Sequence, residues 1–427
     1  MVIDKVEAGH SAHAEHRAAF FRQSGWLMIA NIAGGVFMWA VHLLNKKVPE
    51  GAYGNFGAFL SVLMFVPTTP LQMVMAHQAA AALATGRERQ LTAMVRWFWL
   101  CLTLLWLVGA VAVVVFHQAI LDYWKIGNAT GLWLMLPLVL LSVWSPVFQG
   151  TLQGVQDFFW LGWSMLSNGI GRLVVAAFAV LVLAGGAPGM LAGVMAGLVV
   201  AVLISMWRSR AYWLGASAPF DRLCLLRQVV PLLVGFGAYQ FLFTGDTMFA
   251  KGYFPPRTMD FYVSAGTMSR ALIWLVGPLA SVMFPRIVHS AARSEKTNLM
   301  GLVLLGTAVL GILGALGVSL LGPWLIRFVY DEAYVKIAAG LLPWYVGAMV
   351  PLALANVLLN NLLARGSSAF AWALAVLAAA YGFALTRFHQ TPVAVLQTMG
   401  VCNLVLLALC AIFTWLGKGS ASSELAA

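Results

Sequence analysis

Residues 299–321 read LMGLVLLGTAVLGILGALGVSLL, a run that contains no Asp, Glu, Lys or Arg. About 20 such residues in a helix, rising 1.5 Å each, span the hydrocarbon core of a bilayer. The chain as a whole has the same character: 62% of its 427 residues are apolar and 9% are charged, whereas soluble proteins carry roughly 25% charged residues. This composition excludes a soluble protein and predicts an integral membrane protein.

Apolar stretches of spanning length recur about twelve times along the chain. Because lipid offers no partner to unpaired backbone groups, and no barrel-like alternation is present, we predict an all-α protein with about twelve transmembrane helices. We expect them near residues 26–44, 56–84, 97–116, 132–152, 158–183, 190–207, 225–250, 261–288, 299–321, 338–363, 370–385 and 393–416. Pro67, Pro70 and Pro278 fall within these stretches and should kink them.

The distribution of Lys and Arg over the connectors sets the orientation. Of the 25 Lys and Arg residues, fifteen fall on the side that holds both termini, eight fall on the other side, and two lie within spans. The side richer in Lys and Arg is the cytoplasmic one, so we expect both termini in the cytoplasm. The net charge of +11 is scattered without a basic block, so we expect no nucleic-acid partner.

The second half of the chain repeats features of the first. Residues 70–75 (PLQMVM) match residues 278–283 (PLASVM), and residues 153–160 (QGVQDFFW) match residues 365–372 (RGSSAFAW). Six helices per half make the repeat a parallel one, which is an architecture of transporters with the binding site between two lobes. The domains that we expect are a cytoplasmic segment over 1–22, an N-lobe over 23–208, a connector over 209–224, a C-lobe over 225–416 and a disordered tail over 417–427.

Two arginines, Arg172 and Arg270, lie near the middle of predicted spans, where a cation that faces lipid costs about 2.5 kcal/mol or more. In one interpretation Arg270 forms a structural ion pair with Asp246, the only acid that we place within a span. In the other, one guanidinium from each lobe binds an anionic head group, because guanidinium grips phosphate oxygens in bidentate fashion. Asp246 is also a candidate for coupling to protons or sodium ions.

Other polar residues within the spans give weaker signals. Asn31 and Gln240 are candidates to line the cavity with the two arginines. Gln149 and Gln153 share a helix face and are more typical of bonds between helices. The GxxxGxxxG pattern over residues 189–197 predicts close helix packing.

Motifs of the common enzyme classes are missing from the sequence. It contains no GxxxxGK[ST] loop, no HExxH motif and no GxSxG motif. The spacing of the four cysteines and of the N-terminal histidines does not match a metal site. A membrane-embedded sugar polymerase or ligase would need a large outer loop with catalytic groups, and no outer connector exceeds roughly twenty residues. We expect no enzyme, no metal site, and no cofactor apart from a coupling proton or sodium ion.

Three short motifs resemble those of a known family. Residues 51–56 (GAYGNF) resemble the turn that enters helix two of the polysaccharide-biosynthesis flippases, in the multidrug/oligosaccharidyl-lipid/polysaccharide exporter superfamily, with the acid of that turn displaced to Glu50. Residues 245–254 (GDTMFAKGYF), with Arg270, resemble the family's segment of helices seven and eight, and residues 284–286 (FPR) resemble its cytoplasmic end.

This resemblance implies two lobes around a V-shaped central cavity in a bacterial cytoplasmic (inner) membrane. It implies alternating access that flips a polyprenyl-diphosphate-linked oligosaccharide from the cytoplasmic to the outer leaflet. The implied partners are this lipid-linked oligosaccharide, membrane lipids and other polysaccharide-assembly proteins. Arg270 lies on the helix that carries a diphosphate-binding arginine in related flippases, whereas no motif assigns Arg172.

A cation-coupled multidrug exporter of the same superfamily is the main alternative. Such an exporter moves organic cations and would need acids in its cavity. Two arginines against one aspartate in the predicted spans favour an anion instead.

Overall fold

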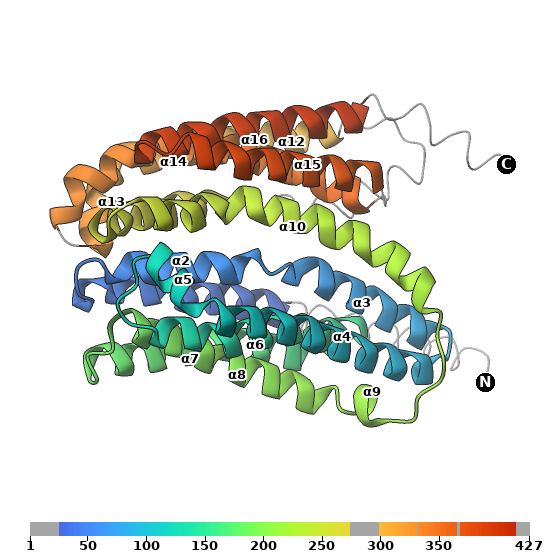
Figure 1. Ribbon diagram of the computed structural model, residues 1–427. Helices are drawn as coiled ribbons and strands as arrows, with labels where there is room; N and C mark the ends of the chain where they lie inside the picture. The colour runs from blue at the N-terminus through green and yellow to red at the C-terminus, as the bar shows by residue number, and fades with distance from the viewer. Residues whose placement is uncertain (1–24, 274–298, 331, 365–367, 416–427) are drawn as a thin grey trace, which may run out of the picture. The chain divides into compact units, whose positions relative to one another are not determined.

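The computed structural model describes residues 25–273, 299–330, 332–364 and 368–415. Every regular element among these residues is a helix (Figure 1). Eleven stretches of this part of the chain are long and apolar enough to cross a membrane. The helix over residues 256–273 belongs to the expected span over 261–288, whose remainder lies outside the described residues. The predicted all-α membrane fold of about twelve helices is confirmed.

The helices cover the predicted apolar stretches and extend several residues beyond most of them, because polar first and last turns also adopt helical structure. The first candidate span, Gly25–Lys47, ends in a 3₁₀ helix, η1 (Val41–Lys47). The others are α2 (Ala52–Phe65), α3 (Thr68–Ala84), α4 (Glu88–Val115), α5 (His117–Tyr123), α6 (Thr130–Gly154), α7 (Phe158–Leu181), α8 (Gly186–Arg208), α9 (Ala211–Leu214), α10 (Arg222–Tyr253), the helix over 256–273, α12 (Leu299–Leu320), α13 (Gly322–Val329), α14 (Glu332–Ala364), α15 (Ser368–Arg387) and α16 (Pro392–Trp415).

The second predicted span is broken where Pro67 stands. Helix α2 ends at Phe65, and Val66 is extended with a φ of −63° and a ψ of 122°. The proline ring disfavours the helical conformation in the residue before it. The predicted kink at Pro67 is therefore confirmed, in the form of a break between α2 and α3. Pro70 falls in the first turn of α3, where proline is tolerated, so the kink expected there is wrong.

Several predictions fall outside the described residues. These are the cytoplasmic segment over 1–22, the tail over 417–427, Pro278 with its repeat segment over 278–283, the FPR motif over 284–286, and residues 365–367 of the second repeat match.

The chain folds as two compact units. The first comprises the described residues up to Leu44 with 68–116 and 130–221, and the second comprises 45–67, 117–129 and the chain from Arg222 onward. Helices α2 and α5 belong to the second unit, although the helices that flank them in sequence belong to the first.

Small residues bring helices together within the first unit. A Cβ on Gly193 of α8 would lie 2.5 Å from Cβ of Ala176 on α7, and one on Gly197 would lie 2.7 Å from Oδ1 of Asn168. Such distances leave no room for a side chain, so the GxxxGxxxG pattern packs α8 closely against α7 as predicted.

Two glutamines of α6 join helices in the same unit. Nε2 of Gln72 on α3 donates to Oε1 of Gln153 at 3.0 Å. Nε2 of Gln149 donates to Oγ of Ser164 on α7 at 3.3 Å. The predicted role of Gln149 and Gln153 in bonds between helices is confirmed.

Candidate functional site

Asp246 and Arg270 form an ion pair inside the second unit. Nη2 of Arg270 lies 2.7 Å from Oδ1 of Asp246, and the two side chains are 11% and 0% exposed, respectively. Asp246 lies in α10, and Arg270 lies in the next helix along the chain, over 256–273. Removing both charges from water is costly, and the attraction offsets this only where the remaining lone pairs are also satisfied.

Three hydroxyl groups complete the surroundings of the Asp246 carboxylate. Oη of Tyr262 donates to Oδ2 at 2.8 Å, and Oγ1 of Thr247 donates to the same oxygen at 3.3 Å. Oη of Tyr345, on α14, also donates to Oδ2. With Arg270 these residues form the group that we call the Asp246 cluster: Asp246, Thr247, Tyr262, Arg270 and Tyr345. The carboxylate is therefore surrounded by donors from three helices.

Contacts within the cluster also hold the Arg270 guanidinium in place. Nη2 donates to Oγ1 of Thr247 at 2.8 Å, and Nε donates to the carbonyl of Phe243 at 3.3 Å. The guanidinium carbon lies 5.6 Å from the centre of the Phe243 ring and 5.3 Å from that of Tyr345. Gly266 leaves space for it, because a Cβ there would lie 2.9 Å from Nη1. An anion that binds Arg270 must therefore compete with Asp246.

The other predicted arginine, Arg172, belongs to the first unit. It lies in α7 and is 9% exposed. Its backbone is part of the close contact with α8, since a Cβ on Gly193 would lie 2.5 Å from the Arg172 carbonyl oxygen. The glycines of α8 therefore allow close packing at the level of the Arg172 backbone.

Asn31 and Gln240 were predicted to line a cavity. Asn31 is exposed on the helix over residues 25–40. Nε2 of Gln240 donates to the carbonyl of Met64 at 2.6 Å, in the last turn of α2. The break after Phe65 removes the helical donors that this carbonyl would otherwise meet, and Gln240 supplies one from α10. The structure thus shows a capping contact for Gln240.

Asp260 is 1% exposed and lies within the helix over 256–273. Its Oδ2 accepts from the backbone nitrogen of Gly51 at 2.5 Å, and its Oδ1 accepts from that of Gly54 at 2.6 Å. Tyr334 also donates to Oδ2, at 3.3 Å. A carboxylate at a helix N-terminus accepts hydrogen bonds from the free N–H groups and interacts favourably with the positive end of the helix dipole. Asp260 thus caps the N-terminus of α2.

Close packing accompanies this cap. Gly51 has a φ of 81°, a conformation that favours glycine, and a Cβ on Gly54 would lie 2.7 Å from Cβ of Met259. Oη of Tyr53 lies 2.9 Å from Oη of Tyr330. Burial, with Tyr53 beside it, raises the pKa of Tyr330 well above its ordinary value, so this hydroxyl stays protonated. Residues 51–56 (GAYGNF) are therefore the segment through which α2 packs against the rest of the second unit.

Lys251 lies in the last turn of α10 and is 0% exposed. Its Nζ has no hydrogen-bond partner among the described residues. Tyr123 of α5 covers the adjacent Gly252, and Nζ of Lys125 donates to the carbonyl of Tyr253 at 3.1 Å. Packing of α5 thus accounts for a burial that the local sequence did not indicate.

We compared the sequence and the structure with those of known proteins. No family model and no curated protein matches the sequence. An inward-facing multidrug resistance MATE family transporter of the MOP superfamily matches with a TM-score of 0.70 at 12% identity, over 91% of this chain and 96% of that one. The lipid II flippase MurJ, in an inward closed conformation, matches with a TM-score of 0.67 at 13% identity, over 92% and 87%. A eukaryotic MATE transporter matches with a TM-score of 0.65 at 15% identity, over 92% and 96%.

The chain has the fold of these MATE transporters and of the lipid II flippase MurJ. It is a multi-pass membrane protein, and these structural neighbours are transporters and a flippase, not enzymes. Because multidrug transporters and a lipid flippase share this fold, the fold alone does not indicate the substrate.

Proposed function

We propose that this protein flips a polyprenyl-diphosphate-linked oligosaccharide from the cytoplasmic to the outer leaflet by alternating access. The observation that supports an anionic substrate is the balance of buried charge. Among the described residues, the buried cations Arg172, Lys251 and Arg270 outnumber the buried acids Asp246 and Asp260. An excess of positive charge in a membrane protein attracts phosphate groups and repels organic cations.

The Asp246 cluster supports the same substrate and a means of coupling. Phosphate oxygens that approach Arg270 must displace Asp246, and an ionised carboxylate left behind would be buried without its counter-ion. A coupling cation at Asp246, either a proton or a sodium ion, would relieve that cost. In this proposal substrate binding at Arg270 is linked to a coupling cation at Asp246, with polysaccharide-assembly proteins supplying or consuming the lipid in a bacterial cytoplasmic membrane.

A cation-coupled multidrug exporter remains the second candidate, favoured by the MATE transporters among the structural neighbours. In that case Asp246 would bind the organic cation or the coupling ion. The donors that surround its carboxylate leave little room for a further cation in the described state.

Ligand-induced stabilisation separates the two candidates. Purified protein is heated with a short-chain polyprenyl-diphosphate disaccharide or with ethidium, a typical organic cation. A ligand at 100 times its Kd stabilises the folded state by about 2.7 kcal/mol. We expect the diphosphate lipid to raise the unfolding temperature and ethidium to leave it unchanged. The reverse pattern would overturn this proposal in favour of the exporter.

A further inference from the structure

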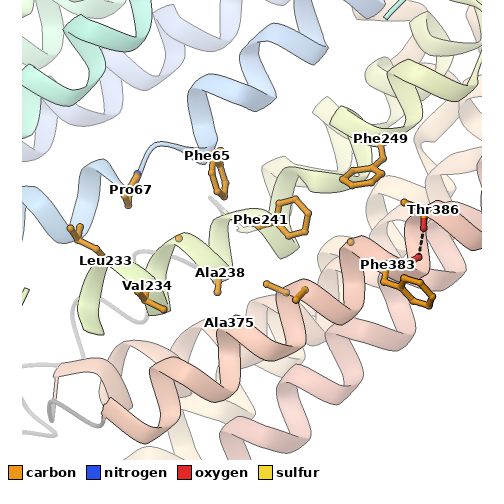
Figure 2. A pocket seen from close by; sticks show the side chains of 14 residues that line it. Phe65, Pro67, Leu233, Val234, Ala238, Phe241, Phe249, Ala375, Phe383 and Thr386 are labelled. Carbon is orange, nitrogen blue, oxygen red and sulfur yellow. Dashed lines mark hydrogen bonds between the residues drawn. The ribbon is translucent and has the colours of Figure 1, made fainter. Parts of the chain in front are cut away.

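A long apolar groove follows α10 within the second unit. Its volume is about 630 Å³, within the range of ligand-binding pockets. The lining residues run from Leu233 to Phe249 on α10 and from Ala375 to Thr386 on α15, and Phe65 and Pro67 also line it, with Phe65 beside Phe241 (Figure 2). At 1.5 Å per residue the α10 portion is about 24 Å long, most of a hydrocarbon core of roughly 30 Å. We call this feature the α10–α15 groove.

Its lining selects against a polar or cationic ligand. Of the fourteen lining residues, Thr386 alone has a polar side chain, and its Oγ1 donates to the carbonyl of Phe383 at 2.7 Å. No acid lines the groove to balance an organic cation. The polar groups of a drug-like molecule would lose their hydrogen bonds to water there, at a cost of several kcal/mol each. A flexible hydrocarbon chain is the ligand that suits an elongated apolar groove.

One end of the groove carries a positive charge. Arg387 is the last residue of α15 and follows Thr386 directly. Its guanidinium carbon lies 5.3 Å from the centre of the Phe383 ring, and that ring lines the groove. The Arg387 side chain is exposed, so its donors are available to an anion. The apolar groove therefore suits the hydrocarbon chain of an anionic lipid, and Arg387 at its end suits the phosphate head.

We infer that the α10–α15 groove binds the chain of a polyprenyl lipid whose phosphate head lies at Arg387. This inference rests on the proposed function, which supplies the polyprenyl chain. The positive-inside distribution places Arg387 on the outer side, so the groove would hold the lipid in the outer leaflet.

Gly237 gives a sharp test, because it lines the groove and a Cβ there meets nothing within 4 Å. Gly237→Leu therefore fills the groove without a backbone clash, and leucine favours a helix more than glycine does. The matched control is Gly347→Leu, on the exposed face of α14, where a Cβ also meets nothing within 4 Å. Arg387→Ala removes the head-group contact, and Arg327→Ala is its control at another exposed arginine.

The probe is a polyprenyl monophosphate with a photoreactive group in its chain, cross-linked to purified full-length protein and mapped by mass spectrometry. We expect labelling of α10 and α15, at least about a tenfold lower affinity in Gly237→Leu, and up to about fivefold lower affinity in Arg387→Ala. Both controls should bind as the parent does. Unchanged labelling in Gly237→Leu, at an unfolding temperature equal to the parent's, would overturn the groove assignment.

Competition on the parent protein gives an answer that depends on no variant. Unlabelled polyprenyl phosphate should displace the probe, whereas polyprenol should displace it less well and inorganic phosphate not at all. Equal displacement by polyprenol would refute the head-group contact, and equal displacement by two-chain phosphatidylglycerol would refute a polyprenyl site. This assay measures binding in the groove alone, so its failure is distinct from a failure of the parent to move the diphosphate lipid between leaflets.

Discussion

At the residue scale, the Asp246 carboxylate is the most constrained charged group of the second unit. Arg270 and hydroxyl groups from three helices bind it, and none of its surface reaches solvent. Such a group tolerates the loss of a partner poorly, because an ionised carboxylate then remains buried without compensation. Loss of one partner should therefore cost more in the buried Asp246–Arg270 pair than in the exposed pair between Arg327 and Glu332.

Arg270→Ala should therefore lower the free energy of unfolding by about 3–5 kcal/mol. Arg327→Ala, the matched loss of an exposed arginine, should cost less than about 1 kcal/mol. Denaturant unfolding of the purified variants measures both values. A double variant that also carries Asp246→Ala should recover part of the loss, since the stranded charge is gone. Equal, small effects of the two arginine substitutions would refute the buried ion pair.

Asp246→Asn tests the proposed competition between Asp246 and the substrate for Arg270. Asparagine is close to aspartate in size and carries no charge, so it should leave the Arg270 guanidinium available to phosphate oxygens. The variant should bind a polyprenyl diphosphate more tightly than the parent does in an equilibrium binding assay.

Asp157→Asn is the control for that assay, since Asp157 pairs at 2.6 Å with the half-exposed Arg208 of the first unit. It should bind the lipid as the parent does. An affinity of Asp246→Asn equal to the parent's would refute the competition for Arg270.

At the element scale, α2 is held by its N-terminus and interrupted at its C-terminal end. Asp260 accepts the first free N–H groups, and Gln240 donates to a carbonyl freed by the break before Pro67. Both contacts come from helices more than 170 residues further along the chain. They explain why α2 belongs to the second unit although its neighbours in sequence belong to the first.

Asp260→Ala should release the first turn of α2, at a cost of about 1–2 kcal/mol for the lost cap. Hydrogen exchange of the amides over 52–65 should become faster, while exchange in α16 stays unchanged. Glu50→Ala removes a nearby acid that is exposed and should leave the α2 amides as protected as in the parent. Unaltered protection in Asp260→Ala would show that the cap contributes nothing to the docking of α2.

The helices themselves could be predicted from the sequence, because each described span contains an apolar stretch with few charged residues that is long enough for a bilayer. The docking of α2 could not, since hydropathy carries no information on which helices touch. For the same reason the burial of Lys251 and Asp260 could not be predicted, because a polarity pattern does not show that a neighbouring helix encloses a charge.

The candidate site was predictable only in part. Asp246 and Arg270 stand out as charges within spans, and their pairing is one of the two interpretations that the sequence left open. Tyr345 binds the same carboxylate from 99 residues away, and no local pattern marks it. Gln240 donates to the carbonyl of Met64, and this contact depends on where α2 breaks, which no pattern around Gln240 indicates.

At the scale of the whole molecule, multidrug transporters and a lipid flippase share the fold, so the fold does not indicate the substrate and the buried charges are the available evidence. Buried arginine and lysine exceed buried acid among the described residues. Liposomes that contain the protein should therefore not take up ethidium when a proton or sodium gradient is imposed. Uptake that the gradient drives would contradict the anion assignment.

Movement of the substrate between leaflets is the most direct measurement. Unilamellar vesicles are made with the purified protein and a trace of polyprenyl-diphosphate disaccharide bearing a fluorescent group, and a membrane-impermeant reductant is added outside. Protein-free vesicles lose the outer half of the signal. With the parent protein nearly all of the signal should disappear, because lipid from the inner leaflet reaches the outer one. Loss of only half the signal, from vesicles shown to contain folded protein, would contradict the central claim.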